Sequence, residues 1–172
     1  MTRLGLTGGI GMGKSTSAEL LAKRGAKVSD SDQLARELVE PGQPALAEIA
    51  GAFGYDVLRQ DGSLDRAKMA ALVFNDSTAR EKLEGILHPR IREARQARLD
   101  GWAAAGERLA VAVIPLLFET RAEVNFDRIV CVTCSPEAQR ERLRERGWSD
   151  DQISSRLEAQ MAVDEKMKRA DH

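Results

Sequence analysis

The stretch Leu4-Gly5-Leu6-Thr7-Gly8-Gly9-Ile10-Gly11-Met12-Gly13-Lys14-Ser15-Thr16 decides the fold of this chain. It contains the phosphate-binding loop pattern G-x-x-x-x-G-K-S/T, with a short apolar run before it and a helical pattern after it. In such a loop, successive backbone N–H groups surround the phosphates of a nucleotide, and the positive end of the helix dipole points at the same place. Lys14 offers a cation for the outer phosphates, and Ser15 offers a hydroxyl ligand for magnesium. The sequence therefore predicts a nucleotide-binding protein.

Length and composition indicate a single globular domain, residues 1–172. The chain is 42% hydrophobic and 31% charged, and its formal net charge is −1. This balance provides no long-range field for nucleic acid or a membrane surface, so we expect neither as a partner. No apolar run approaches transmembrane length, and Met1 leads almost directly into the first apolar run with no signal peptide ahead of it. We therefore expect a cytoplasmic protein.

Cys131 and Cys134 form a lone C-x-x-C pair. A zinc site would need further ligands, and His88 and His172 are the only histidines. A redox pair is an alternative, because a helix is predicted to begin just after Cys134. The β-branched residues around Cys131 favour a buried strand instead, in which cysteine serves as a small hydrophobic residue.

Alternating strand and helix patterns predict an α/β fold of the P-loop NTPase type, a parallel sheet flanked by helices. Strands are predicted over residues 3–7, 27–32, 109–118 and 128–133, with regular pairing in the third ending near Pro115. Helices are predicted over residues 14–24, 33–39, 44–52, 65–74, 136–146 and 150–169. Thr78 and Glu81 resemble a capping box, and Pro89 is expected to open a further long helix. Residues 44–105 are therefore expected to form an inserted helical subdomain.

Ligands bind beyond the carboxyl ends of the strands in a sheet of this kind. The phosphate loop, the carboxylates of Asp30 and Asp32, and the segment 115–119 all fall at those ends. Phosphoryl transfer needs a phosphate cradle, a metal, neutralising charge and a group that positions the acceptor oxygen. Asp32 is predicted to accept the proton of an acceptor hydroxyl, whereas a helix cap is its alternative role. Asp30, two residues earlier, would share its face of the strand.

Two sets of arginines accompany this site. Arg142 and Arg146 lie four residues apart on the predicted helix 136–146 and could act together on phosphates as part of a lid, residues 136–160. Arg156 and Gln160 present a second pair with the same spacing. Arginines 90, 92, 95 and 98 follow Pro89, and they either form a solvated face or meet an anionic substrate.

Other classes of nucleotide-binding protein fit the sequence less well. There is no N-K-x-D stretch to bind guanine, which argues against a GTPase or switch protein. The buried strand before Glu119 lacks a Walker-B aspartate, which argues against a transporter-type or motor ATPase. A kinase acting on a small molecule remains, with a nucleoside or a sugar as the alternative acceptor.

The chain resembles dephospho-CoA kinases, whose loop typically reads T-G-G-I-G-S-G-K-S-T. The resembling segments, in chain order, are residues 7–16, Asp30-Ser31-Asp32, 35–42, Leu87-His88-Pro89-Arg90-Ile91, 113–119 and Arg156-x-x-x-Gln160. This resemblance implies ATP-dependent phosphorylation of the ribose 3′-hydroxyl of dephospho-CoA, the last step of coenzyme A synthesis, with magnesium.

The resemblance also implies roles for particular residues. Asp32 would be the general base, and Lys14 would assist catalysis. ATP would bind to Gly11, Met12, Gly13, Lys14, Ser15 and Thr16 together with Arg142 and Arg146. Dephospho-CoA would bind to Thr7, Asp32, Arg36, His88 and Leu116.

The sequence departs from the family pattern at two places. Met12 stands where serine is usual, and little change is expected because the loop binds through its backbone. The family pattern continues past Ala170-Asp171 into a V-I-x-N strand and a final helix, whereas this sequence ends at His172. We therefore expect the final edge strand of the sheet to be absent.

Overall fold

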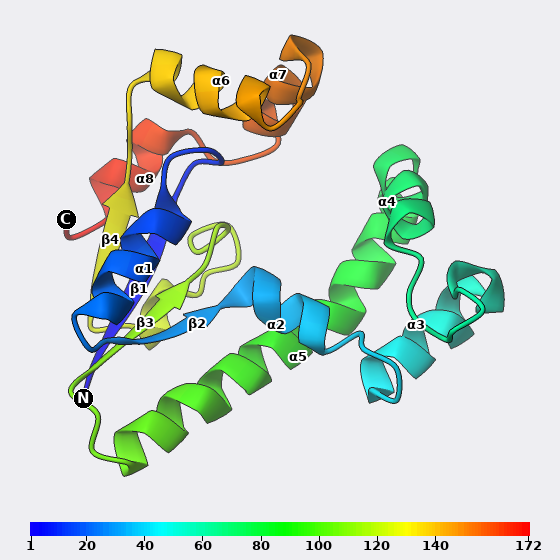
Figure 1. The fold of residues 1–172 in the computed structure, drawn as a ribbon, viewed down its shortest axis with the longest axis horizontal. Helices are drawn as coiled ribbons and strands as arrows, with labels where there is room; N and C mark the ends of the chain where they lie inside the picture. Colours follow the sequence, from blue (N-terminus) through cyan, green and yellow to red (C-terminus); the bar gives the residue numbers. More distant parts are fainter. The chain divides into compact units, whose positions relative to one another are not determined.

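The computed structural model describes residues 1–172 (Figure 1), and the chain divides into two compact units. The sheet unit comprises Met1–Asp30 and Leu99–His172. The helical unit comprises Ser31–Arg98.

The sheet unit is built on four parallel strands in the order β2-β3-β1-β4. Their bounds are β1 Thr2–Gly8, β2 Lys27–Asp30, β3 Leu109–Val113 and β4 Arg128–Val132. The central strand β3 carries an almost continuous apolar sequence, as expected of a parallel strand covered on both faces. The predicted α/β fold is therefore confirmed, and β3 ends two residues before Pro115, which has no N–H to donate to a neighbouring strand.

The two faces of the sheet are covered by different segments. Helix α1 (Lys14–Lys23) packs its Ala18 against Leu6, Val111 and Val113 on one face. Because side chains alternate along a strand, Ala112 points to the opposite face. There it joins a second cluster with Ile114, Leu117, Phe118, Ala122 and Ile129. The sheet thus holds the loop after β1 and the segment after β3 on a closely packed base.

Three more helices complete the sheet unit: α6 Pro136–Glu145, α7 Asp150–Glu158 and α8 Val163–Arg169, after a short 3-10 turn η2 (Glu123–Asn125). Ser135 caps α6, and Ser149 forms a reciprocal capping box with Gln152 at the start of α7, both as predicted. The single helix predicted over residues 150–169 is wrong. The Met161 N–H donates to the Glu119 carboxylate at 3.1 Å, so a tertiary hydrogen bond replaces a helical one between α7 and α8.

The helical unit contains α2 Ser31–Glu37, α3 Pro44–Phe53, η1 Tyr55–Val57, α4 Arg66–Asn75 and α5 Ser77–Ala104, the last of which continues into the sheet unit. Its own core consists of Val39, Leu46, Ile49, Val57, Met69 and Ile86. This separate apolar cluster explains how the segment forms a compact unit of its own.

Two predicted boundaries in this unit are wrong. Strand β2 ends at Asp30 and α2 begins at Ser31, so Asp32 lies in the first turn of a helix and not in a strand. The alternation argument that placed Asp30 and Asp32 on one face therefore fails, and Asp32 is not the residue that precedes its helix.

The second error concerns helix α5. The carboxylate of Asp76 accepts from the N–H groups of Thr78 and Ala79, so Asp76 caps this helix and Thr78 does not. Pro89 lies inside α5 and does not open a new helix. Proline has no N–H to donate to the Gly85 carbonyl, so the helix passes through this position with one backbone hydrogen bond fewer.

Strand β4 has a further pairing on the edge opposite β1. The Cys131 N–H donates to the His172 carbonyl at 2.8 Å, and the His172 N–H donates to the Ile129 carbonyl at 3.1 Å. Bonding of one residue to positions on both sides of its partner is the pattern of a parallel pair. Asp171 and His172 therefore cover part of this edge.

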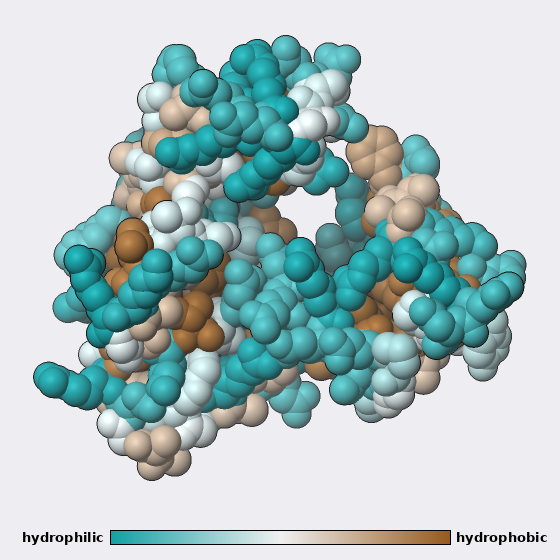
Figure 2. Space-filling model, viewed as in Figure 1, coloured by the Kyte–Doolittle hydropathy of each residue, from teal (hydrophilic) through white to brown (hydrophobic).

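The surface is mostly polar. On the face seen in Figure 2, hydrophilic residues dominate and hydrophobic ones appear in small groups. Tyr55, Phe74 and Val124 are the most exposed large hydrophobic residues. None of the helices combines the length and the apolar character needed to cross a bilayer.

Candidate active site

The loop between β1 and α1 has a backbone that only glycine permits. Gly8 has φ of +144°, and a Cβ at this position would lie 2.2 Å from the Val132 carbonyl oxygen of β4. Gly13 is left-handed, with φ of +94°, and no side chain caps the helix that it begins. Without a side-chain cap, the first-turn N–H groups of α1 are available to an anion at its N-terminus.

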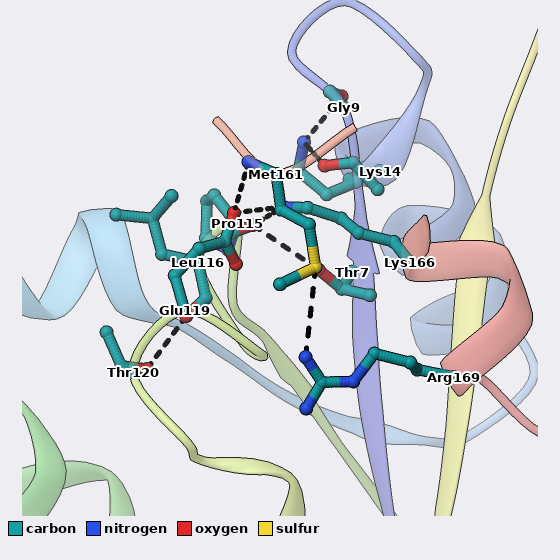
Figure 3. Close-up of polar contacts among 11 residues, drawn as sticks. Thr7, Gly9, Lys14, Pro115, Leu116, Glu119, Thr120, Met161, Lys166 and Arg169 are labelled. Carbon is teal, nitrogen blue, oxygen red and sulfur yellow. Dashed lines mark hydrogen bonds and ion pairs between the residues drawn. The ribbon is translucent and has the colours of Figure 1, made fainter. Parts of the chain in front are cut away.

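Lys14 already lies over this loop. Its Nζ donates to the carbonyl oxygens of Gly8 at 2.9 Å and Gly9 at 2.8 Å (Figure 3). Ser15 and Thr16 follow in the first turn of α1, and both are exposed. A cation, two residues with hydroxyl groups and the start of a helix thus follow directly on the carboxyl end of β1.

Helix α6 packs against the loop between β1 and α1. Gln139, which is buried, donates through Nε2 to the Ile10 carbonyl at 2.7 Å. Leu143 is fully buried, and its Cγ would lie 3.0 Å from a Cβ at Gly11. Met12 is also buried, so its side chain packs inward and only its backbone is available to a nucleotide. Gln139 was missed from the sequence because its partner lies 129 residues away.

The arginines of α6 differ in their surroundings. Arg142 is exposed, and its Nη1 would lie 3.8 Å from a Cβ at Gly13, which places it beside the start of α1. Arg146 is the exposed residue that ends α6. Arg144 pairs on the surface with Asp150 at 2.8 Å. Arg142 is therefore the arginine of α6 that the structure brings to the loop.

The segment after β3 is fixed by a buried lysine (Figure 3). Lys166 of α8 is fully buried and donates to the Pro115 carbonyl at 2.7 Å. It also pairs with Glu119 at 2.8 Å, and the Thr7 hydroxyl donates to the same Pro115 carbonyl at 3.3 Å. This network links β1, the end of β3 and α8 around half-buried Leu116. No sequence signal indicated Lys166, because its helix reads as a run of charged, exposed residues.

The residues predicted to bind the acceptor, other than Thr7 and Leu116, lie in the helical unit. Asp32 is exposed in the first turn of α2, and Arg36 is exposed in the last turn of the same helix. His88 is half-buried on α5. One short helix, α2, and one long helix, α5, thus present these side chains from a unit with its own core.

The cysteines form no disulfide. Burial raises the pKa of the Cys131 thiol, although the charges of Lys166 and Lys14 lower it in part. The thiol form is therefore favoured, which argues against a redox pair. Cys131 lies in β4 as predicted but is half-buried, so the predicted full burial is wrong. No group of three or more His, Cys, Asp or Glu side chains gathers to hold a metal, as a zinc site would require.

A parallel sheet, a glycine loop running from β1 into α1 and a lysine seated on that loop define a P-loop nucleotide-binding protein. A family model described as dephospho-CoA kinase matches residues 2–172. The chain belongs to the dephospho-CoA kinase family.

Curated relatives agree with this assignment. A dephospho-CoA kinase from Anaeromyxobacter dehalogenans is 51% identical over 172 residues, which covers 99% of this chain and 82% of the relative. One from Bdellovibrio bacteriovorus is 43% identical, with 99% of this chain and 85% of the relative covered. Enzymes of this name make CoA from dephospho-CoA in the last step of CoA biosynthesis.

Solved structures show the same fold. A crystal structure from Thermus thermophilus superposes with a TM-score of 0.84 at 35% identity, and covers 98% of this chain and 85% of its own. The dephospho-CoA kinase from Campylobacter jejuni gives a TM-score of 0.72 at 27% identity, with the same coverage. The family, the fold class and the kinase class predicted from the sequence are confirmed, and ATP follows as the substrate of a kinase.

Proposed function

We propose that this chain transfers the γ-phosphoryl group of ATP to the ribose 3′-hydroxyl of dephospho-CoA, which yields ADP and CoA. The observation that carries the proposal is the glycine loop with Lys14 held on it, in a chain of this family. In the transfer, the 3′-oxygen bonds to the γ-phosphorus, and the bond from that phosphorus to the β,γ-bridging oxygen breaks.

The sheet unit supplies the ATP site. Backbone N–H groups of Gly11–Thr16 bind the phosphates, and Lys14 exchanges its carbonyl partners for phosphate oxygens. Arg142, which lies beside Gly13, adds a second cation, and Arg146 is assigned the same role from the proposed lid, residues 136–160. Negative charge that builds up on the transferring group is stabilised by these fixed donors and cations.

The acceptor is bound and activated by other residues. Asp32 takes the proton that the 3′-hydroxyl loses, and its exposed carboxylate supports this role. Arg36 and His88, together with the helical segment 44–105, bind dephospho-CoA. Thr7 and Leu116 contact it from the ends of β1 and β3.

Magnesium fits the donors of the loop. Mg²⁺ takes one or two protein oxygens and completes its shell with water and substrate phosphates, so a site needs few protein ligands. The Ser15 hydroxyl is exposed at the start of α1 and makes no hydrogen bond, so it is open to a metal. When bound, the metal neutralises phosphate charge.

The test is turnover with defined acceptors. Purified protein with ATP, magnesium and dephospho-CoA should release ADP and form CoA in equal amounts, as followed by chromatography. Lys14→Met is the matched control, and it should abolish both products. A nucleoside or a sugar should replace dephospho-CoA poorly. The proposal fails if one of these acceptors is phosphorylated efficiently and dephospho-CoA is not.

A further inference from the structure

The arginines of helix α5 fall into two classes that the sequence did not separate. Arg90 forms an ion pair with Glu48, and Arg98 forms one with Glu37. Neither Arg92 nor Arg95 makes a hydrogen bond or an ion pair with any residue. Two charges of this helix are therefore neutralised within the helical unit and two are not.

Arg95 is the unusual member of the second class. It is only 6% exposed, although arginine is almost never buried without a partner. Burial lowers the pKa of its guanidinium, and the nearby charge of Arg92 lowers it further. The Arg95 guanidinium has no acidic partner and a second positive charge beside it, which is unfavourable in the free protein. Its nitrogen atoms still touch solvent, so an incoming group can reach them. An anion at this place would remove the penalty.

The spacing along α5 puts Arg95 in line with other candidate binding residues. Residues three and four apart share a face of a helix, so His88, Arg92 and Arg95 form one stripe. His88 is half-buried, Arg92 is exposed and Arg95 is buried. The exposed fraction therefore differs along this stripe, from exposed Arg92 to buried Arg95, and neither arginine is paired with an acidic side chain.

We propose that Arg95, assisted by Arg92, binds the diphosphate group of dephospho-CoA. The inference rests on the proposed function, because that function supplies the acceptor. The glycine loop accounts for the phosphates of ATP, while the acceptor brings a second diphosphate between its adenosine and pantetheine parts. The planar fork of a guanidinium matches two phosphate oxygens at once, which suits it to this group.

Binding measurements test the proposal without relying on turnover. Calorimetry would measure the Kd of dephospho-CoA at a saturating concentration of a non-hydrolysable ATP analogue, which keeps the glycine loop occupied. Arg95→Met should weaken binding about 10- to 100-fold, the range for losing a charge-assisted hydrogen bond. Arg90→Met is the matched control from the same helix, and it should change Kd less than threefold, as its charge is already paired. Equal Kd values for the wild type, Arg95→Met and Arg90→Met would overturn the proposal.

Two further readouts separate binding from structure. Adenosine lacks the diphosphate, so its binding should be the same in the wild type and in Arg95→Met. Without ligand, Arg95→Met should unfold at the same or a higher denaturant concentration, because an unpaired buried charge is replaced by an apolar chain. A lower unfolding midpoint with equal losses for adenosine and dephospho-CoA would mean that Arg95 is a structural residue.

Failure of the proposed function would look different. If the wild type binds dephospho-CoA but does not phosphorylate it, the function is wrong, and the comparison of Kd values still decides the role of Arg95.

Discussion

The phosphate loop and helix α5 are both suited to anions, but they use different parts of the chain. The loop relies on main-chain geometry, with Gly8 packed against the backbone of β4 and Gly13 in a left-handed conformation. Helix α5 relies on side chains, with Arg92 and Arg95 left without acidic partners. Its backbone is regular helix throughout.

This difference predicts opposite sensitivities to mutation. A side chain at Gly8 disturbs the loop whatever its charge, because there is no space for a Cβ, and one at Gly13 is strained by the left-handed backbone. A side-chain site tolerates changes of shape and fails when a charge or a proton acceptor is lost. Substitutions at the loop glycines should therefore act through the volume that they add, and substitutions in the helical unit through the charge that they remove.

The largest effect is expected from Asp32→Asn, which changes one acceptor atom in the helical unit and almost no volume. Loss of a general base should lower kcat about 10²- to 10⁴-fold, while an ATP analogue still binds. Steady-state kinetics and analogue titration measure the two quantities. Asp164→Asn, an exposed acid in the first turn of α8, is the control and should keep normal turnover. Near-normal kcat for Asp32→Asn would remove Asp32 from catalysis.

The same substitution in the two regions gives the next comparison. Gly8→Ala should lower the free energy of unfolding by about 3 kcal/mol or more, since its Cβ would lie 2.2 Å from a backbone oxygen. Gly51→Ala, in α3 with open space around it, should raise stability by about 0.4–1 kcal/mol. Urea unfolding of both variants provides the measurement, and similar values for the two would contradict the distinction.

Two lysines of α8, one in a buried ion pair and one in an exposed ion pair, allow the effect of charge burial on stability to be compared. Lys166→Met removes one partner of a buried ion pair and should lower the free energy of unfolding by about 2–3 kcal/mol, less than for a fully dry pair because Glu119 is partly exposed. Lys168→Met breaks an exposed pair with Glu165 and should change stability by less than about 0.5 kcal/mol. Equal effects would show that Lys166 does not hold the segment after β3.

The smallest effect concerns the support of the loop by α6. Gln139→Leu removes the hydrogen bond to the Ile10 carbonyl and should lower stability by about 1 kcal/mol. Because Ile10 belongs to the loop, the KM for ATP should rise a few-fold while the KM for the acceptor stays constant. Gln60→Leu, at an exposed turn, serves as the control. An unchanged KM for ATP would mean that the loop keeps its shape without α6.

Much of the fold could be predicted because its signals are local. The glycine loop, the continuous apolar strand before Pro115 and the serine caps at residues 135 and 149 each depend on neighbours in the sequence. The ends of helices and strands were less predictable where a tertiary contact replaces a hydrogen bond within the element. The Glu119 carboxylate accepts the Met161 N–H and interrupts a helix, and α5 continues through Pro89 although proline removes one of its hydrogen bonds.

The site was predictable to the same extent. The loop residues and Asp32 follow strands directly, so their sequence positions indicate their place in the fold. Lys166 was not predictable, because its partners Pro115 and Glu119 lie about fifty residues away in the chain. Arg90 and Arg98 form ion pairs with Glu48 and Glu37, whereas the other two arginines of α5 do not. No local sequence pattern shows which arginine pairs with which glutamate.

The position of Lys14 bears on how ATP binds. Lys14 is half-buried, and its ammonium group donates to two loop carbonyls. An arriving phosphate therefore replaces these carbonyl oxygens as the partners of the ammonium group. The positive charge that ATP needs is thus already placed on the loop before the nucleotide binds.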